Sequence, residues 1–132
     1  MLNSFSLDDR VVVVTGGGTG LGRAMSLALA KAGADIVVAG RRVGPIEEVS
    51  TLVTGLGRRG MAVQTDVTHS DDVAYLLKRT LCEFGKADVL INNAGMVGGQ
   101  GGVPIWEISD DDWRSVLEAN LTSTFYCARI FA

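Results

Sequence analysis

The sequence predicts an α/β fold with a parallel sheet, and two observations favour it. Short segments rich in β-branched residues recur at nearly even spacing, and patterns of helical period lie between them. The strand segments are VVVV from Val11, DIVVAG from Asp35, MAVQTDV from Met61 and ADVLINN from Ala87. Continuous apolar runs of this kind are typical of strands buried on both faces, and strands that alternate with helices indicate βαβ units.

The first helix is expected over residues 19–32, directly after the first strand. Gly33 would follow it as a left-handed residue just past the C-terminus. Apolar side chains of this segment recur at helical spacing, so the pattern predicts one buried face made of Leu21, Met25, Ala28 and Ala32.

The next two helices have recognisable ends. Pro45 suits the first turn of the second helix, which we expect to end near Gly55. Ser70 is expected to cap the third helix, and Gly85 to close it. Apolar and small side chains repeat along this third helix at Val73, Leu76, Leu77, Thr80, Leu81 and Phe84.

The last third of the chain is expected to hold a loop and a final helix. Residues 96–104 read MVGGQGGVP, which indicates a mobile loop. Ser109 is expected to cap the final helix, with Asp112 at the third helical position.

Composition limits the classes of protein to consider. The chain has 132 residues, 47% of them hydrophobic and 20% charged, with a net charge of −3. We therefore expect one domain over residues 1–132, with no membrane span and no basic face for nucleic acid. The N-terminus lacks signal-peptide features and the cysteines suggest no disulfide framework, so a cytoplasmic location is expected. With His69 as the only histidine, we expect no metal site.

The first strand runs directly into the glycine-rich turn TGGGTGLG and then into a helix. Glycine lets a phosphate approach the backbone, and a helix start offers unpaired N–H groups. The glycine spacing Gly16, Gly20, Gly22 differs from GxGxxG, and no Lys-Ser/Thr pair of a P-loop follows. The strand and helix on either side favour dinucleotide binding, while a simple tight connection is the alternative.

Further motifs follow the later strands. The full set is Thr15-Gly16-x-x-x-Gly20-x-Gly22, Asp66-Val67, Asn92-Asn93-Ala94-Gly95 and Asn120. In this order and at these elements they resemble the short-chain dehydrogenase/reductase family over essentially the whole chain. The resemblance implies a Rossmann-like doubly wound parallel sheet with strand order 3-2-1-4, in which the family's remaining strands are absent from this chain.

The resemblance also implies a role for each motif. Asp66 and Val67 would contact the adenine, and Asn120 would be the active-site asparagine that holds a water in the proton relay. The residues implied to surround the pyrophosphate and the ribose are Thr15, Gly16, Gly18, Thr19, Gly20, Leu21, Gly22, Asn93, Ala94 and Gly95. As an alternative, Asp66 and Asn92 could simply close loops through hydrogen bonds to the backbone.

The end of the second strand predicts which dinucleotide is bound. NAD-binding folds usually place an acidic residue there, whereas this chain has Gly40 followed by Arg41 and Arg42. A small residue followed by cations suits a 2′-phosphate, so NADP(H) is favoured over NAD(H). Alternatively, the two arginines merely solvate a loop.

Catalysis in this family needs a tyrosine with a lysine four residues later. From Tyr126 that position is Ile130, so we interpret Tyr126 as a packing residue. The chain also lacks the family's catalytic serine, so it is expected to be a C-terminally truncated cofactor-binding half without turnover. The intact parent would act on a small carbonyl or alcohol substrate and form a homo-oligomer, and a non-catalytic dinucleotide-binding or subunit-interaction module is the alternative.

Overall fold

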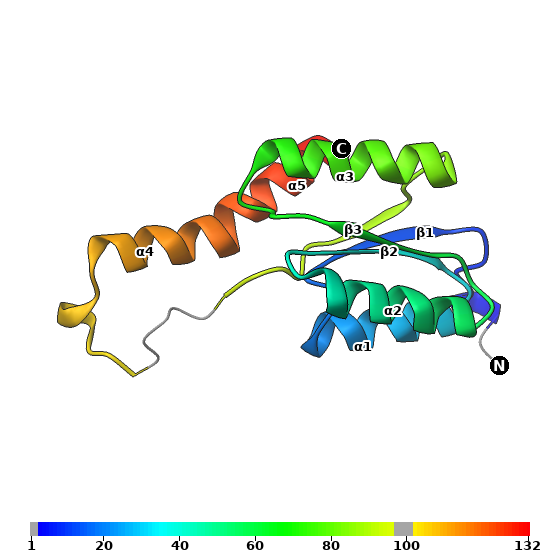
Figure 1. The fold of residues 1–132 in the computed structure, drawn as a ribbon, viewed down its shortest axis with the longest axis horizontal. Coiled ribbons are helices and arrows are strands. Elements are labelled where there is room, and N and C mark those ends of the chain that lie inside the picture. Colours follow the sequence, from blue (N-terminus) through cyan, green and yellow to red (C-terminus); the bar gives the residue numbers. More distant parts are fainter. Residues whose placement is uncertain (1–2, 97–101) are drawn as a thin grey trace.

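The computed structural model describes residues 3–96 and 102–132 and contains a four-stranded parallel sheet between layers of helices (Figure 1). The strands are β1 (Val11–Thr15), β2 (Asp35–Gly40), β3 (Gly60–Gln64) and β4 (Val89–Ile91). Their order is β3-β2-β1-β4 and every pairing is parallel, which confirms the predicted order. Residues 97–101 of the predicted loop lie outside the described residues.

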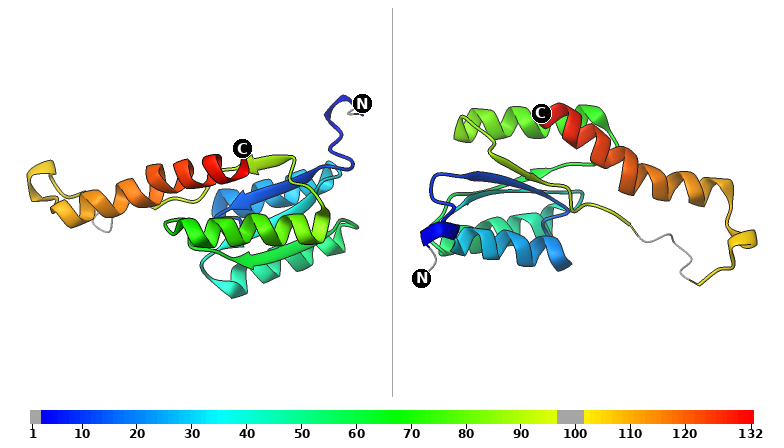
Figure 2. Two further views of the ribbon diagram at one scale, coloured as in Figure 1. Left: turned by 90° about the horizontal axis from the view of Figure 1, so that it is seen from above. Right: turned by 180° about the vertical axis from the view of Figure 1, so that it is seen from behind.

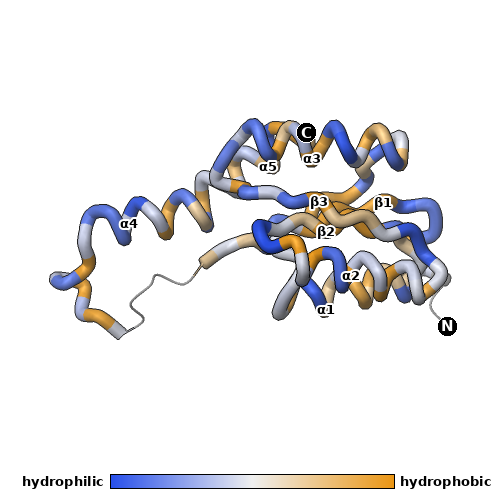
Figure 3. Tube along the Cα trace, viewed as in Figure 1, coloured by the Kyte–Doolittle hydropathy of each residue, from blue (hydrophilic) through white to orange (hydrophobic). Residues whose placement is uncertain are grey.

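Helices cover both faces of this sheet (Figures 1 and 2). One face carries α1 (Gly20–Lys31) and α2 (Val43–Gly55), and the other carries α3 (Ser70–Phe84) and α5 (Ser123–Phe131). The strands alternate their side chains between two cores, as their period of two requires. Val12, Val14, Ile36 and Val38 pack with α1 and α2, while Val11, Val13, Val37 and Leu76 form the core under α3. Figure 3 shows the resulting apolar strands at the centre of the molecule.

The buried face of α1 differs from the predicted one. Leu21 is 77% exposed and Ala28 is also exposed, whereas Gly22, Ser26 and Ala30 are buried. Gly22 and Ser26 lie against the glycine turn, where larger side chains have no room, and Ala30 packs in the core. The Ser26 hydroxyl satisfies itself by donating to the carbonyl of Gly22 at 2.8 Å.

The bounds of α2 and α3 agree closely with the predicted helices. Pro45 lies in the first turn of α2, and α3 ends before Gly85, whose φ of 76° is left-handed. The N-cap of α3 is His69 rather than Ser70. Leu81 is 45% exposed, so the predicted apolar face of α3 is only partly buried.

The final helix begins as predicted but is not one regular α-helix. The Ser109 hydroxyl accepts from the Asp112 N–H at 3.1 Å and caps α4 (Asp110–Leu117). A π-helical segment, η3 (Glu118–Thr122), then leads into α5. Short 3-10 turns, η1 (Asn3–Phe5) and η2 (Ile105–Glu107), complete the described elements. Helix α4 extends beyond the sheet (Figure 1), and none of its residues is buried.

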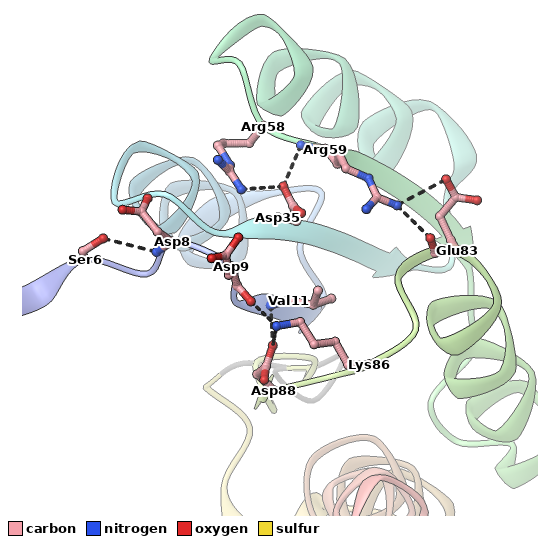
Figure 4. A network of polar contacts seen from close by, with 10 residues as sticks. All are labelled: Ser6, Asp8, Asp9, Val11, Asp35, Arg58, Arg59, Glu83, Lys86 and Asp88. Carbon is pink, nitrogen blue, oxygen red and sulfur yellow. Dashed lines mark hydrogen bonds and ion pairs between the residues drawn. The ribbon is translucent and has the colours of Figure 1, made fainter.

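A polar network ties the amino ends of the strands together (Figure 4). Asp35 accepts from the Arg59 N–H at 2.9 Å and pairs with Arg58 at 3.1 Å. Asp88 accepts from the Val11 N–H at 2.8 Å and so joins β4 to β1. That hydrogen bond lowers the pKa of Asp88, and the ammonium of a nearby lysine adds to the effect. The network therefore holds the amino ends of the strands together, at the end of the sheet opposite to the predicted site.

None of the described helices combines the length and apolar composition that a bilayer crossing requires.

Candidate functional site

A groove of about 630 Å³ lies at the carboxyl ends of the strands. Parallel strands all end at this edge, which brings the turns that follow them together. Of the residues predicted from the sequence, those that line the groove are Gly16, Gly18, Thr19, Gly40, Arg41, Arg42, Asp66, Val67, Ala94 and Gly95. Thr15, Gly20, Leu21, Gly22, Asn93 and Asn120 lie around it without lining it.

The glycine turn forms the floor of the groove from bare backbone. Gly16 has a left-handed φ of 62°, and a Cβ atom there would lie 3.0 Å from the Cα of Ala94. A Cβ atom at Gly22 would overlap the carbonyl oxygen of Gly16 and approach the Asn93 amide nitrogen to 2.5 Å. The turn, the start of α1 and the segment after β4 therefore pack at distances that only glycine permits.

Thr15 and Asn93 join the glycine turn to the segment after β4. The Thr15 hydroxyl accepts from the N–H groups of Asn93 and Ala94, each at 3.1 Å. The Asn93 side-chain amide donates in return to the carbonyls of Thr15 at 3.1 Å and Gly16 at 3.0 Å. These two side chains consequently shape the groove floor from below.

The start of α1 leaves backbone donors beside the floor. Thr19 is the N-cap of this helix, and its side chain makes no capping hydrogen bond. The first N–H groups of a helix have no partner within the helix, and the dipole makes this end positive. The geometry is therefore suited to an anionic group at the floor of the groove.

Two arginines on the groove wall lack the side-chain contacts that the other described arginines make. Arg41 and Arg42 follow β2, both are exposed, and both line the groove. Among the described side chains, every other arginine has an ion pair, a hydroxyl partner or an aromatic ring. Arg41 and Arg42 make none of these contacts within the described part of the chain, so their cationic groups remain available to an anion.

Asp66 also lines the groove and closes the turn after β3, which is next to the turn that carries Arg41. It accepts from the Thr68 N–H at 3.0 Å and the Thr68 hydroxyl at 2.6 Å, and it pairs with His69 at 3.2 Å. Partial burial acts to raise the pKa of Asp66, but the Thr68 hydrogen bonds, helped by the charges of His69 and Arg41, lower it overall. The loop-closing role considered from the sequence is therefore present, and contact with an adenine stays a prediction.

Asn120 ties the π-helical segment η3 to the chain after β4. Its side-chain oxygen accepts from the Met96 N–H at 3.1 Å, and its nitrogen donates to the carbonyls of Met96 at 2.8 Å and Val116 at 3.0 Å. A Cβ atom at Gly95 would collide with the Asn120 oxygen. Both N–H groups of the amide are in use, so a bound water at this side chain has only the second lone pair of the oxygen.

Tyr126 is partly buried on α5 and is not among the residues that line the groove. Its ring lies 6.0 Å from that of Phe125 and 5.6 Å from the guanidinium carbon of Arg129. These contacts agree with its interpretation as a packing residue.

Several lining residues were not predicted from the sequence. They are Pro45, Ile46, Thr65, Thr68, Met96, Ser115, Glu118 and Ala119. Four of them, Thr65, Thr68, Met96 and Ala119, are direct neighbours of predicted residues in the sequence. Ser115 and Glu118 carry no motif, and only the approach of the last helix to Met96 places them here.

Comparison with known proteins identifies relatives of the whole chain. Residues 10–132 match the model of a family described as short chain dehydrogenase. The 2-dehydro-3-deoxy-D-gluconate 5-dehydrogenase of Escherichia coli (strain K12) is 40% identical, with 100% of this chain and 50% of the relative covered. The 3beta-hydroxysteroid dehydrogenase of Mediterraneibacter gnavus is 38% identical, with 92% of this chain and 44% of the relative covered.

Solved structures that resemble this chain carry the same family name. The crystal structure of a short-chain type dehydrogenase/reductase from Mycobacterium marinum has a TM-score of 0.91 at 29% identity, covering 98% of this chain and 50% of that one. That of a short chain dehydrogenase from Mycobacterium smegmatis has a TM-score of 0.88 at 35% identity, covering 96% and 52%. The chain thus spans about half the length of the relatives that it matches.

Proposed function

Because this chain belongs to the short chain dehydrogenase family, we propose that it forms the cofactor-binding half of an oxidoreductase that acts with NADP(H) on a small carbonyl or alcohol substrate. Membership of the family implies a nicotinamide cofactor, which supplies or accepts hydride when bound. The preference for NADP(H) rests on the residues of this chain.

The observation that carries this preference is the pair of arginines on the groove wall. Arg41 and Arg42 line the groove and have no anionic partner among the described residues. Gly40, where an acidic residue would bond a ribose hydroxyl, has no carboxylate to repel a phosphate. A 2′-phosphate would give the arginines charge-assisted hydrogen bonds.

In this proposal the remaining groove residues each contact a different part of the cofactor. Gly16, Gly18 and Thr19 hold the pyrophosphate with backbone N–H groups and the positive end of α1. Asp66 and Val67 contact the adenine. The lining residues Ala94 and Gly95 face the nicotinamide-side ribose, and Thr15, Gly22 and Asn93 support the turn from beneath the floor. Gly20 and Leu21 are exposed at the start of α1 and lie beside the pyrophosphate in this proposal.

The test of cofactor preference is a titration of NADPH and NADH by cofactor fluorescence. NADPH should bind more tightly by about tenfold to a hundredfold, the range that corresponds to charge-assisted hydrogen bonds. The double variant Arg41→Ala/Arg42→Ala should lose most of that difference and keep its affinity for NADH. Arg114→Ala is the matched control, since Arg114 is exposed, pairs with Asp111 at 3.5 Å and is not among the residues that line the groove. Equal affinities for NADPH and NADH in the unaltered chain would contradict the preference for NADP(H).

The chemical step needs a proton donor in addition to the cofactor. In this proposal Asn120 positions the segment after β4 and supplies one acceptor to the proton relay. A polypeptide of these 132 residues contains no Tyr-x-x-x-Lys pair, so it should bind the cofactor without turnover. A steady-state assay with NADPH and a panel of carbonyl compounds tests this expectation. Turnover that Tyr126→Phe abolishes would contradict it.

Exposed apolar side chains support the expectation of a homo-oligomer. Trp106 is 82% exposed, Trp113 61% and Leu121 65%, and all three belong to the segment from η2 to η3. Apolar surface of this kind favours association. Light scattering that shows a monomer across the micromolar range would count against an oligomer. A cytoplasmic location remains a prediction, which microscopy of a tagged protein would test.

A further inference from the structure

The loop that carries Arg41 and Arg42 has one side-chain tether among the described contacts. The loop connects Gly40, the last residue of β2, to Val43, the first residue of α2. The ladder to β3 continues as far as Gly40, whose carbonyl accepts from the Thr65 N–H at 2.8 Å. Beyond that point, the side-chain amide of Gln64 donates to the carbonyl of Arg41 at 3.0 Å.

The position of Gln64 makes this tether a direct one. Gln64 is the last residue of β3 and lies opposite Gly40 in the parallel register. Its side chain therefore starts beside the end of β2 and reaches the next carbonyl along the chain. Gln64 is exposed, so its hydrogen bond is not needed to fill the core.

The tether acts on both arginines because a peptide group is rigid. The carbonyl of Arg41 and the N–H of Arg42 belong to one planar unit. Holding the oxygen of that unit restricts rotation on either side of it, and this rotation sets the directions of both side chains. Arg42 is the N-cap of α2 with an extended backbone, φ −98° and ψ 123°, and no side chain caps the helix there. Without the tether, the peptide would be free to turn while the strand and helix remained in place.

We infer that Gln64 is a positioning residue that holds Arg41 and Arg42 toward the 2′-phosphate of NADP(H). This inference rests on the proposed function and adds a residue that itself need not touch the cofactor. It predicts that loss of the Gln64 amide weakens the binding of NADPH and leaves the binding of NADH nearly unchanged.

The test replaces Gln64 with methionine, which keeps the length of the side chain and removes the donor. NADPH affinity of the full chain should fall by about threefold to tenfold, the range expected for the loss of one hydrogen bond. NADH affinity should change by less than about twofold. Thr54→Val is the matched control, because it removes another exposed side-chain bond to a carbonyl, that of Ser50 at 3.1 Å on α2. The control should leave the ratio of the two affinities unchanged.

A second measurement separates positioning from general loosening. In the Arg41→Ala/Arg42→Ala background, Gln64→Met should no longer affect NADPH affinity, because its effect passes through the arginines. Equal weakening of NADPH and NADH, or a loss that persists without the arginines, would overturn the inference. If the unaltered chain does not distinguish NADPH from NADH, the proposed cofactor preference itself fails, which is a different result from an ineffective Gln64→Met in a discriminating protein.

Discussion

Replacing Thr15 with valine isolates the hydrogen bonds that join the glycine turn to the segment after β4. Valine has the shape and the β-branching of threonine, so the strand conformation is retained. The Thr15 side chain is almost fully buried, and its hydroxyl accepts two N–H groups at 3.1 Å and donates to the carbonyl of Ile91 at 3.3 Å. The Asn93 N–H group also donates to the carbonyl of Ile91 at 3.0 Å, so the substitution leaves the Ala94 N–H group without its acceptor and removes the bond that Thr15 donates.

The magnitude follows from the unpaired Ala94 N–H group and from the lost hydrogen bond to Ile91. A partly buried N–H group without a partner costs about 1–3 kcal/mol, and a lost hydrogen bond about 0.5–1.5 kcal/mol, so Thr15→Val should reduce the free energy of unfolding by about 2–4 kcal/mol. Thr65→Val is the matched control, because Thr65 is equally buried at 1% exposed and its hydroxyl bonds only the carbonyl of Val63, at 3.0 Å. The control should lose about 0.5–1.5 kcal/mol.

Urea unfolding followed by circular dichroism measures both variants. A loss of 2–4 kcal/mol corresponds to a midpoint lower by about 1–2 M for a chain of this size. NADPH and NADH affinity should fall together in Thr15→Val, since the turn serves the part that both cofactors share. Equal losses of stability in Thr15→Val and Thr65→Val would refute the reasoning, because the Ala94 N–H group would then have found another partner.

The remaining predictions concern specificity, reactivity and pH. Gly40→Asp should narrow or reverse the NADPH preference in fluorescence titrations. The Cβ atom of the new residue would lie 2.8 Å from the Ile46 Cγ2, so this variant should be combined with Ile46→Leu, which lacks that methyl group. Burial raises the pKa of the Cys127 thiol to about 11, so iodoacetamide at pH 8 should modify the exposed Cys82 and spare Cys127, as mass spectrometry of the native protein would show. The pKa of Asp88 is lowered in the folded chain, so its stabilisation is complete above the ordinary value near 4 and is lost as pH falls through the folded pKa. Asp88→Asn should therefore lose stability at pH 7 and show a smaller further loss between pH 5 and pH 2, whereas an unchanged acid profile would contradict this assignment.

The parallel sheet and the location of the groove could be predicted from local patterns in the sequence, whereas the strand order 3-2-1-4 is predicted by the resemblance to the family. Apolar runs with helices between them specify parallel pairing, and the carboxyl ends of parallel strands meet at one edge. The turns from Gly16, Gly40, Asp66 and Ala94 are therefore neighbours in the fold, although they are far apart in the sequence.

Features that depend on contacts between distant segments could not be predicted. Periodicity indicated a helix at α1, but the close approach to the glycine turn selects small residues such as Ser26 for its buried face. Periodicity also cannot reveal the π-helical segment around Asn120, whose side chain bonds to Met96 in another part of the chain. Likewise, nothing in the sequence around Gln64 indicates that its amide reaches the carbonyl of Arg41.

The glycines of the turn are restricted in two different ways, and this sets the mutational tolerance of the turn. At Gly22 a side chain is excluded by space, because its Cβ atom would overlap the carbonyl oxygen of Gly16. At Gly20 nothing lies within 4 Å of an added Cβ atom, and only the φ of 53° opposes a side chain. Asparagine enters this left-handed region more readily than most residues, so Gly20→Asn is compatible with the fold, whereas Gly22→Ala would push α1 away from the turn. A combinatorial library that diversifies the turn can therefore vary position 20 and must keep position 22 as glycine.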